Sequence, residues 1–345
     1  MNIYKILKLA GINSIPAPLK RLGLWAMLAT RRRCIGVFMD PVLACNIRCR
    51  MCYFSDSEKR RSMHGVISDK ELKAMADILL PYALKLQIGC GAEPTLYPRL
   101  EEIISLGRKA GVPYISLTTN GQLIAKGKVS LQKLVEAGLN EITVSLHGTS
   151  KDIYEDLMQG ADFGLFLELL RQLSDVKRSH RDFKIRVNFT VNSKNIDDLY
   201  DDRFFRIWDD AGVHPDILQL RPVQNMGDSS WNDFDLTPLI ENYDATIGNV
   251  VNRSKERGIT CLAPDIEAIR NVDDNQDGTS AMIEDITYCY VGPGSFYKPD
   301  FDIDRDTFTS YHRRHHTARK ILRSVFTGAG GRNRNASKKL NYKVK

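Results

Sequence analysis

The chain has 345 residues, of which 43% are hydrophobic and 26% are charged. This composition is that of a globular protein with enough apolar side chains for a sizeable core. The longest apolar stretches, such as residues 22–29, are far too short to span a bilayer, and we expect no signal peptide. We therefore expect a cytoplasmic protein, in which cysteines stay reduced and bind metal or catalyse.

The formal net charge of +7 is unevenly distributed. Residues 1–33 contain seven lysines and arginines and no acidic residue, and residues 307–345 contain eleven and again no acidic residue. The part between them, 34–306, therefore carries 31 basic and 42 acidic side chains. Two basic ends on an acidic body could contact an anionic membrane, as a peripheral protein does, or another phosphate-bearing partner. Two solvated tails are the alternative.

Strand-like and helix-like segments alternate through the middle of the chain. In chain order, the expected strands and the helices that follow them are 34–43 and 68–82, 84–89 and 98–111, 114–120 and 129–138, 141–148 and 163–178, 184–192 and 196–211, and 216–223 and 237–257. A capping box of Ser68 and Glu71 marks the start of the first helix. Residues 258–310 lose this alternation.

Six strand–helix units in a row predict an α/β fold with a parallel sheet and right-handed crossovers. Because a closed barrel needs eight units, six fit a partial (β/α)6 TIM-like barrel, and fit a doubly wound sheet less well. We divide the chain into a basic N-terminal helical segment (1–33), a barrel core (34–235), a divergent C-terminal region (236–310) and a basic, partly disordered tail (311–345).

The densest chemical signal is the cysteine cluster Cys45, Cys49 and Cys52, with the spacing C-x3-C-x2-C directly after the first strand. Three thiolates on one loop can wrap a single metal centre. A structural zinc site needs four ligands, usually in two separated pairs, and no second pair is present nearby. On a [4Fe–4S] cluster, three cysteines leave one iron open for another ligand, which is typical of a reactive site.

Polar or small residues also follow the later strands. In strand order they are Gly91, Ala92, Glu93 and Pro94; Thr119 and Asn120; Ser145 and His147; Asn188, Thr190 and Asn192; and Arg221. Residues 188, 190 and 192 alternate along one strand, so we expect their side chains to face the same way. Because the C-terminal strand ends of a parallel barrel meet at one face, the polar residues predict one shared site there.

The cysteine spacing after the first strand and the Gly-Ala-Glu-Pro turn after the second resemble the radical S-adenosylmethionine (SAM) superfamily. The resemblance implies one [4Fe–4S] cluster on Cys45, Cys49 and Cys52, whose open iron binds SAM, and an external one-electron reductant. Cleavage of SAM would yield a 5′-deoxyadenosyl radical that abstracts hydrogen from a substrate. The residues implied to contact SAM are Met51, Tyr53, Gly91, Ala92, Glu93, Pro94, Thr119, Asn120, Ser145, Asn188, Thr190 and Asn192.

Three departures from the family pattern matter. Met158 stands near the place where many relatives carry an arginine, which leaves the partner of the SAM carboxylate open. Only Cys261 and Cys289 follow the barrel core, too few for a second cluster, so we expect a single one. His147 stands where many relatives carry an aspartate; with Arg221 it is a candidate catalytic residue, and a structural polar role is the alternative.

Three functions remain open on these grounds. The first is a radical SAM enzyme that acts on an unidentified substrate. The second is a relative that modifies a peptide or protein, which the C-terminal region would dock. The third is a non-enzymatic protein that binds nucleic acid or membrane and uses the three cysteines as a structural metal site.

Overall fold

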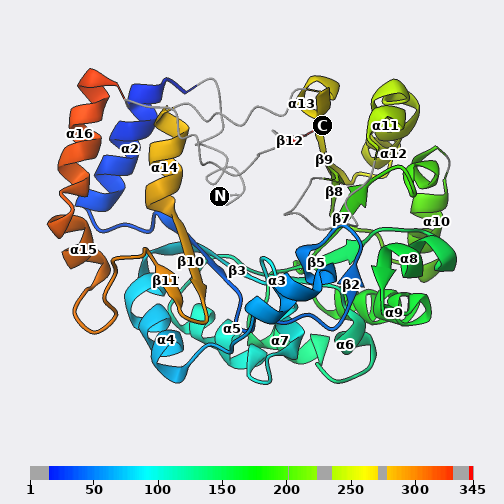
Figure 1. Cartoon of the computed structure of the whole chain (residues 1–345), viewed down its shortest axis with the longest axis horizontal. Coiled ribbons are helices and arrows are strands. Elements are labelled where there is room, and N and C mark those ends of the chain that lie inside the picture. Colours follow the sequence, from blue (N-terminus) through cyan, green and yellow to red (C-terminus); the bar gives the residue numbers. More distant parts are fainter. Residues whose placement is uncertain (1–14, 201, 224–234, 271–277, 329–341, 345) are drawn as a thin grey trace.

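A computed structural model describes residues 15–200, 202–223, 235–270, 278–328 and 342–344. Its centre is a curved ten-stranded sheet (Figure 1). The strands, in their order across the sheet, are β11 (Ser295–Tyr297), β10 (Tyr288–Gly292), β1 (Ile35–Met39), β3 (Ala83–Ile88), β4 (Ile115–Thr119), β5 (Glu141–Leu146), β7 (Lys184–Val191), β8 (Ile217–Pro222), β9 (Thr260–Pro264) and β12 (Tyr342–Val344).

The six predicted strands form a parallel run in chain order, from β1 to β8. The α/β, partial-barrel prediction is therefore confirmed, and the sheet stays open. The prediction that 258–310 leaves the pattern is wrong. Strand β9 extends the run beside β8, and β10 pairs in parallel with β1 at the other end.

The helices connect these strands and flank the sheet. They are α2 (Ala17–Ala29), α3 (Ser57–Ser62), α4 (Asp69–Ala74), α5 (Leu100–Lys109), α6 (Gln122–Ala125), α7 (Leu131–Ala137), α8 (Lys151–Leu157), α9 (Phe163–Ser179), α10 (Arg203–Ala211), α11 (Thr237–Glu241), α12 (Asn249–Glu256), α13 (Ile266–Arg270), α14 (Gly278–Thr287), α15 (Phe308–Arg314) and α16 (Thr317–Thr327). The predicted capping box at Ser68 is present and begins α4. Among these helices none is long and apolar enough to cross a bilayer.

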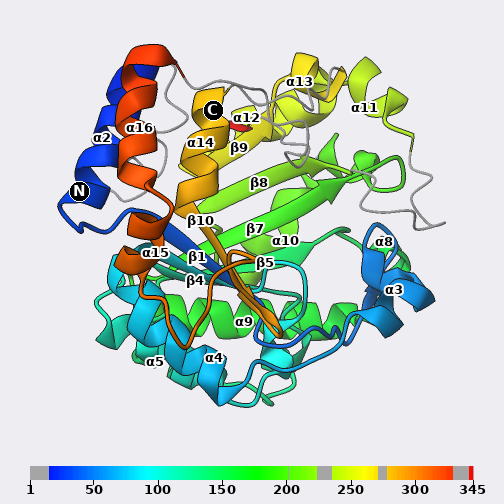
Figure 2. The ribbon, with the colours of Figure 1, turned by 60° about the vertical axis from the view of Figure 1, so that its left-hand side comes forward.

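The sheet has an apolar face and a polar face, and the alternation of side chains decides which is which. Along β7 the residues Val187, Phe189 and Val191 are fully buried, whereas Asn188 and Thr190 between them are half-buried. The apolar face packs against helices such as α9 and α10, which lie outside the curve (Figures 1 and 2). The polar set therefore lines the inside of the curve, as predicted for a barrel strand.

Helices from the N-terminal and C-terminal parts of the chain pack together beside the sheet. Helix α2 packs against α16 at the outer edge of the molecule (Figures 1 and 2). Within the segment 1–33, which we expect to be helical, residues 17–29 form α2. Within the segment 311–345, which we expect to be a basic, partly disordered tail, residues 311–327 form parts of α15 and α16, and both helices bury apolar residues such as Tyr311 and Ile321. Residues 329–341 lie outside the described part.

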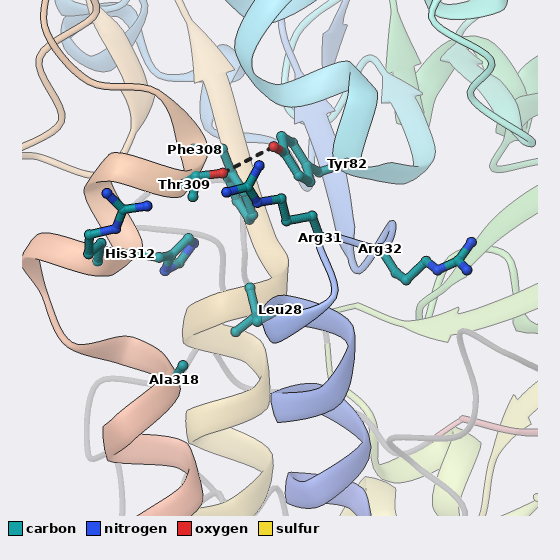
Figure 3. Close-up of a pocket in the computed structure, with 9 residues that line it drawn as sticks. Leu28, Arg31, Arg32, Tyr82, Phe308, Thr309, His312 and Ala318 are labelled. Atoms are coloured by element: carbon teal, nitrogen blue, oxygen red, sulfur yellow. Dashed lines mark hydrogen bonds between the residues drawn. The ribbon is translucent and has the colours of Figure 1, made fainter.

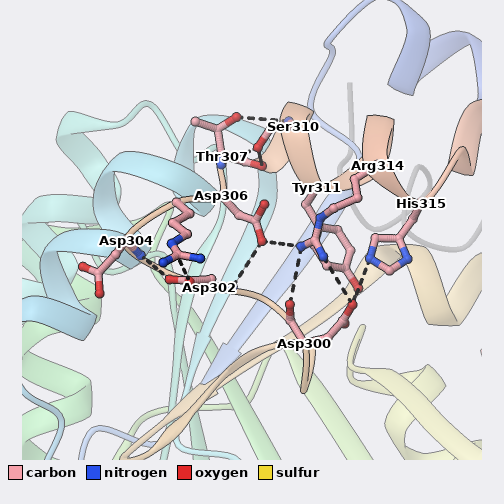
Figure 4. A network of polar contacts seen from close by, with 10 residues as sticks. Asp300, Asp302, Asp304, Asp306, Thr307, Ser310, Tyr311, Arg314 and His315 are labelled. Carbon is pink, nitrogen blue, oxygen red and sulfur yellow. Dashed lines mark hydrogen bonds and ion pairs between the residues drawn. The ribbon is translucent and has the colours of Figure 1, made fainter.

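A polar network closes the loop ahead of α15 (Figure 4). Thr307 and Ser310 form a capping box at the start of the helix. Asp300 accepts a hydrogen bond from the Tyr311 hydroxyl at 2.8 Å, and its other carboxylate oxygen lies 2.9 Å from His315 Nε2. Asp306 forms an ion pair with Arg314 of α15. The aspartates of this loop are therefore engaged in fixing where α15 begins.

Two phenylalanines give a matched test of this packing. Phe204 is fully buried and meets Phe189 edge to face, whereas Phe326 is 83% exposed. Phe204→Ala should lower the free energy of unfolding by about 3–5 kcal/mol because it leaves a cavity between α10 and the sheet. Phe326→Ala should change it by less than about 0.5 kcal/mol. Anaerobic urea denaturation measures both, and equal effects would contradict the assigned core.

Candidate active site at the C-terminal strand ends

The three predicted cysteines lie on one loop after β1. Cys45, Cys49 and Cys52 are half-buried free thiols. Cys49 belongs to β2 (Arg48–Cys49), which pairs antiparallel with β6 (Met158–Gln159), so that Cys49 stands opposite Met158. The next residue, Arg50, donates its backbone N–H to the Leu157 carbonyl at 2.9 Å. The loop is therefore fixed on the segment that follows β5, and the residue that replaces the expected arginine takes part through its backbone.

In the absence of a bound metal, the surroundings of these cysteines favour the neutral thiol over the thiolate. Burial raises the pKa of Cys45 to about 11 and raises that of Cys49 well above its usual value, and the neighbouring thiols add to both shifts. Bound iron would favour the thiolates, since a metal deprotonates its cysteine ligands.

The distance between cysteine ligands differs between a site for a single metal ion and a site for an iron–sulfur cluster. Within the described residues, no three His, Cys, Asp or Glu side chains are placed to share one metal ion. Thiolates around one zinc, each at about 2.3 Å from it, must crowd together. The cysteines of a [4Fe–4S] cluster each bind a different iron and stand further apart. Three free thiols on one loop could bind three irons of such a cluster and leave the fourth iron open.

The predicted Gly-Ala-Glu-Pro turn is organised by Asp40, a buried residue at the end of β1 that we did not predict. One carboxylate oxygen of Asp40 accepts hydrogen bonds from the backbone N–H groups of Cys90, Gly91 and Ala92 at 2.8, 3.1 and 3.2 Å. Its other oxygen accepts the Tyr290 hydroxyl of β10 at 3.0 Å. The only hint in the sequence was an acidic residue directly after a buried strand.

Glu93 connects the turn to the next strand. It is buried, and its carboxylate accepts hydrogen bonds from the Thr95 and Thr119 hydroxyls at 2.5 and 2.7 Å and from the backbone N–H of Asn120 at 2.9 Å. Burial raises the pKa of Glu93, and these hydrogen bonds counteract it. Pro94 is buried beside it. Glu93 and Thr119 thus hydrogen-bond to each other, and they support the backbone of the site.

Asn120 and Tyr53 join this framework to the cysteine loop. The Asn120 amide donates to Asn46 Oδ1 at 2.9 Å and lies 4.0 Å from Cys45 Sγ. The Tyr53 hydroxyl donates to the Gly91 carbonyl at 2.7 Å. A Cβ on residue 91 would stand 2.2 Å from that hydroxyl, so any larger residue there would displace the Tyr53 side chain. The predicted turn and the predicted loop therefore do come together.

Met51 lies on the other side of the loop. It is buried with Leu157 and Val223 in a small apolar cluster of its own, next to Cys49. This position agrees with an apolar contact near the third cysteine, and the cluster also joins the loop to the end of β8.

Ser145 and Asn188 stand side by side on β5 and β7 and are half-buried, with side chains on the polar face. The Oδ1 atom of Asn188 is buried and has no hydrogen-bond partner among the described residues. A buried acceptor of this kind is costly unless a ligand or water satisfies it. The hydroxyl or amino groups of SAM would supply such a donor, so this pair fits the predicted role.

Thr190 and Asn192 are placed differently from one another. Thr190 continues the polar face, and its backbone N–H donates to His147 Nδ1 at 3.1 Å. Asn192 lies beyond the end of β7, fully buried, and its amide oxygen accepts the Lys194 N–H at 2.9 Å. Asn195 Oδ1 accepts the backbone N–H of Asn192 at 2.8 Å within this turn, and the expectation that the Asn192 side chain faces the same way as 188 and 190 stays a prediction.

The two candidate catalytic residues lie near each other. His147 is buried at the end of β5, and the positive charge of Arg221 acts on it. Arg221 is half-buried on β8, opposite Thr190. Asn195, another residue that we did not predict, donates to the His147 carbonyl at 3.0 Å and to the Thr190 carbonyl at 2.8 Å. Its contacts join residues far apart in sequence, so no local pattern announced them.

Comparisons with known proteins agree with this site. A family model described as the radical SAM superfamily matches residues 39–213, just over half of the chain. The probable GTP 3′,8-cyclase of Saccharolobus solfataricus is 30% identical over 207 residues, which cover 58% of this chain and 61% of that protein. The probable GTP 3′,8-cyclase of Sulfurisphaera tokodaii is 28% identical over 180 residues, or 52% of this chain and 54% of that one. The chain thus spans less than two thirds of these relatives.

Among solved structures, SuiB of Streptococcus suis bound to S-adenosylmethionine superimposes with a TM-score of 0.55 at 12% identity. The match covers 83% of this chain and 68% of that one, and a likeness at this identity concerns the fold alone. The matched family segment contains the cysteine loop, the Gly-Ala-Glu-Pro turn and the ends of β4, β5 and β7. This chain belongs to the radical SAM superfamily of enzymes.

Proposed function

We propose that this enzyme holds a single [4Fe–4S] cluster on Cys45, Cys49 and Cys52 and binds SAM at the neighbouring strand ends. When bound, these groups supply the one-electron cleavage of SAM and the 5′-deoxyadenosyl radical that abstracts hydrogen from the substrate. One observation carries the proposal. The loop with the three free thiols lies next to the turn at Gly91, to which the Tyr53 hydroxyl of the same loop donates a hydrogen bond.

The chain's own residues would act by positioning. Asp40 holds the N–H groups of the turn, so the backbone around Gly91 is presented to a ligand in one conformation. Tyr53 occupies the space in which a side chain at 91 would stand, so a ligand meets backbone there. The unsatisfied Oδ1 of Asn188 offers an acceptor to a hydroxyl or amino group. Such preorganisation lowers the entropic cost of placing the reacting groups.

Two further observations support a single cluster. Cys261 and Cys289 are fully buried on β9 and β10, and both belong to the apolar core rather than to the polar face. These strands lie at opposite ends of the parallel run. Neither thiol is placed to ligate iron near the cysteine loop.

The other candidate functions differ in support. Membership of an enzyme superfamily argues against a non-enzymatic metal site. Peptide or protein modification remains the second proposal, although the region expected to dock the substrate also contributes β9, β10 and β11 to the sheet. The names of the relatives given above include a nucleotide, GTP. Transfer of deuterium from a labelled candidate substrate into 5′-deoxyadenosine would decide between a nucleotide and a peptide.

The cysteine assignment has a direct test. Anaerobically reconstituted protein should hold about four irons per chain and release 5′-deoxyadenosine when reduced with SAM. Cys49→Ala should lose both iron and SAM cleavage, because the remaining two thiolates cannot retain the cluster. The control, Cys261→Ala, should keep both. Iron near eight per chain would contradict a single cluster, and iron retained in Cys49→Ala would contradict the ligand set.

Asn188 tests the SAM site apart from the metal. Asn188→Ala should weaken SAM binding by about tenfold, equivalent to about 1.4 kcal/mol, by removing one buried hydrogen-bond acceptor. Thr143→Ala, on the same face of β5 but one step deeper, should leave SAM affinity within about twofold of wild type. Equilibrium binding to the reconstituted enzyme measures both. Equal affinities in wild type and Asn188→Ala would remove Asn188 from the site.

His147 should act as a neutral hydrogen-bonding group. Burial, together with a smaller effect of the positive charge of Arg221, lowers its pKa from 6.5 to about 4. His147 therefore binds a proton more readily in the unfolded chain than in the folded one. The contribution of neutral His147 to the free energy of unfolding is fully present above about pH 6.5 and is lost as the pH falls towards 4. Urea denaturation at about pH 7 and about pH 5.5 should show a smaller loss for His147→Gln than for wild type.

The exposed His64 supplies the control for this measurement. His64→Gln should lose as much stability as wild type over the same pH interval. If His147→Gln also loses as much as wild type, the histidine is not held neutral by the fold, and a role in proton transfer near neutral pH regains support.

A further inference from the structure

A second concave site lies at the opposite end of the barrel from the cysteine loop. It is a pocket of about 220 Å³ lined by residues that include Leu28, Arg31, Arg32, Tyr82, Phe308 and Arg313. Arg31 and Arg32 precede β1 and Tyr82 precedes β3, whereas the cysteine loop follows β1. A single water needs only about 15 Å³, so the pocket has room for a small organic molecule.

The charged side chains that line this pocket are all positive. Arg31, Arg32 and Arg313 are exposed, and none of the three forms an ion pair with a described residue. The segments that supply them, 15–33 and 307–328, contain no acidic residue at all. Guanidinium groups beside an apolar wall favour an anion, and their planar forks match the oxygens of a phosphate.

The other polar groups of the pocket already have partners. The Tyr82 hydroxyl lies 3.1 Å from Thr309 Oγ1. His312 contacts the Tyr297 hydroxyl at 2.9 Å through Nε2 and Thr317 Oγ1 at 3.0 Å through Nδ1. Burial lowers the pKa of His312 to about 4, so its ring is neutral near pH 7. The arginines are therefore the groups that remain for a ligand.

The walls of the pocket are apolar and well packed. Tyr82 and Phe308 stack with ring centroids 4.4 Å apart, and Leu28 and Ala318 face them (Figure 3). Arg31 extends towards this pair of rings, whereas Arg32 points away from it (Figure 3). An anion with a small apolar body could place its charged end at Arg31 and the rest against the rings.

Backbone strain also concentrates around this pocket. Among the described residues, the non-glycine residues with positive φ are Arg31, Tyr297 and His316, at 54°, 55° and 51°. Arg31 lines the pocket, Tyr297 bonds to His312 in its wall, and His316 begins the next helix. Such conformations cost free energy and persist where the surrounding structure imposes them, often at ligand sites.

We propose that this pocket binds an organic phosphate, a small molecule with a phosphate group and an apolar body. A simpler account is that the arginines follow the ends of α2 and α15 and only interact with the helix dipoles. That account predicts a loss of stability when the arginines are replaced, but no dependence on added phosphate. The two accounts therefore differ in a measurable way.

The test uses the reconstituted full chain in phosphate-free buffer, with phenyl phosphate and inorganic phosphate as probes. Calorimetric titration should detect phenyl phosphate binding to wild type that is tighter than binding of inorganic phosphate. The double variant Arg31→Gln/Arg313→Gln should bind phenyl phosphate at least about tenfold more weakly. The control Arg323→Gln, which removes an exposed arginine of α16 outside the pocket, should bind as wild type does.

A second variant keeps the test decisive if the double variant fails to fold. Ala318→Phe fills the pocket while it retains every arginine, and it should also lose phenyl phosphate binding. No binding to wild type, or equal loss in Arg323→Gln, would overturn the proposal. So would binding to phosphatidylglycerol vesicles without binding to phenyl phosphate, because the site would then recognise a membrane surface. None of these readouts depends on iron or on SAM cleavage, so the proposed function stands or falls separately.

Discussion

The carboxylate of Asp40 is the constraint on which the active-site end of the molecule depends. A buried carboxylate is unfavourable unless hydrogen bonds replace its water. Here three backbone N–H groups of the 90–92 turn and the Tyr290 hydroxyl do so. One side chain thus fixes the end of β1, the turn after β3 and the strand β10 relative to each other. The turn can then receive Tyr53 from the cysteine loop at a defined place.

Glu93 extends the same principle to the next strand. Its carboxylate receives donors from its own turn and from the end of β4, and Asn120 in turn holds Asn46 of the cysteine loop. The loop is also paired by its backbone with β6. It is therefore supported from two directions, by side chains from β3 and β4 and by main chain from the segment after β5. A loop held in this way can present three thiols in a fixed arrangement before a cofactor arrives.

Patterns within one segment were readable from the sequence, and contacts between distant segments were not. The alternation in 184–191 correctly placed Asn188 and Thr190 on the polar face. It does not extend to Asn192, because the strand ends one residue earlier and a turn stabilised by Asn195 follows. Asp40 looked like an ordinary strand end, since its partners are 50 residues away or more. The strands β9 and β10 were missed because their place in the sheet depends on pairing with β8 and β1, which lie in other segments of the chain.

The placement of β10 next to β1 has a consequence for how the protein is made. The first strand of the barrel is the neighbour of both β3, which follows soon in the chain, and β10, which begins at Tyr288. Parallel pairing across so long a loop is entropically costly and slow to form. During synthesis, one edge of β1 must therefore stay unpaired until most of the chain has left the ribosome. An exposed strand edge of this kind is prone to aggregation, so the nascent chain should depend on chaperones more than the finished fold suggests.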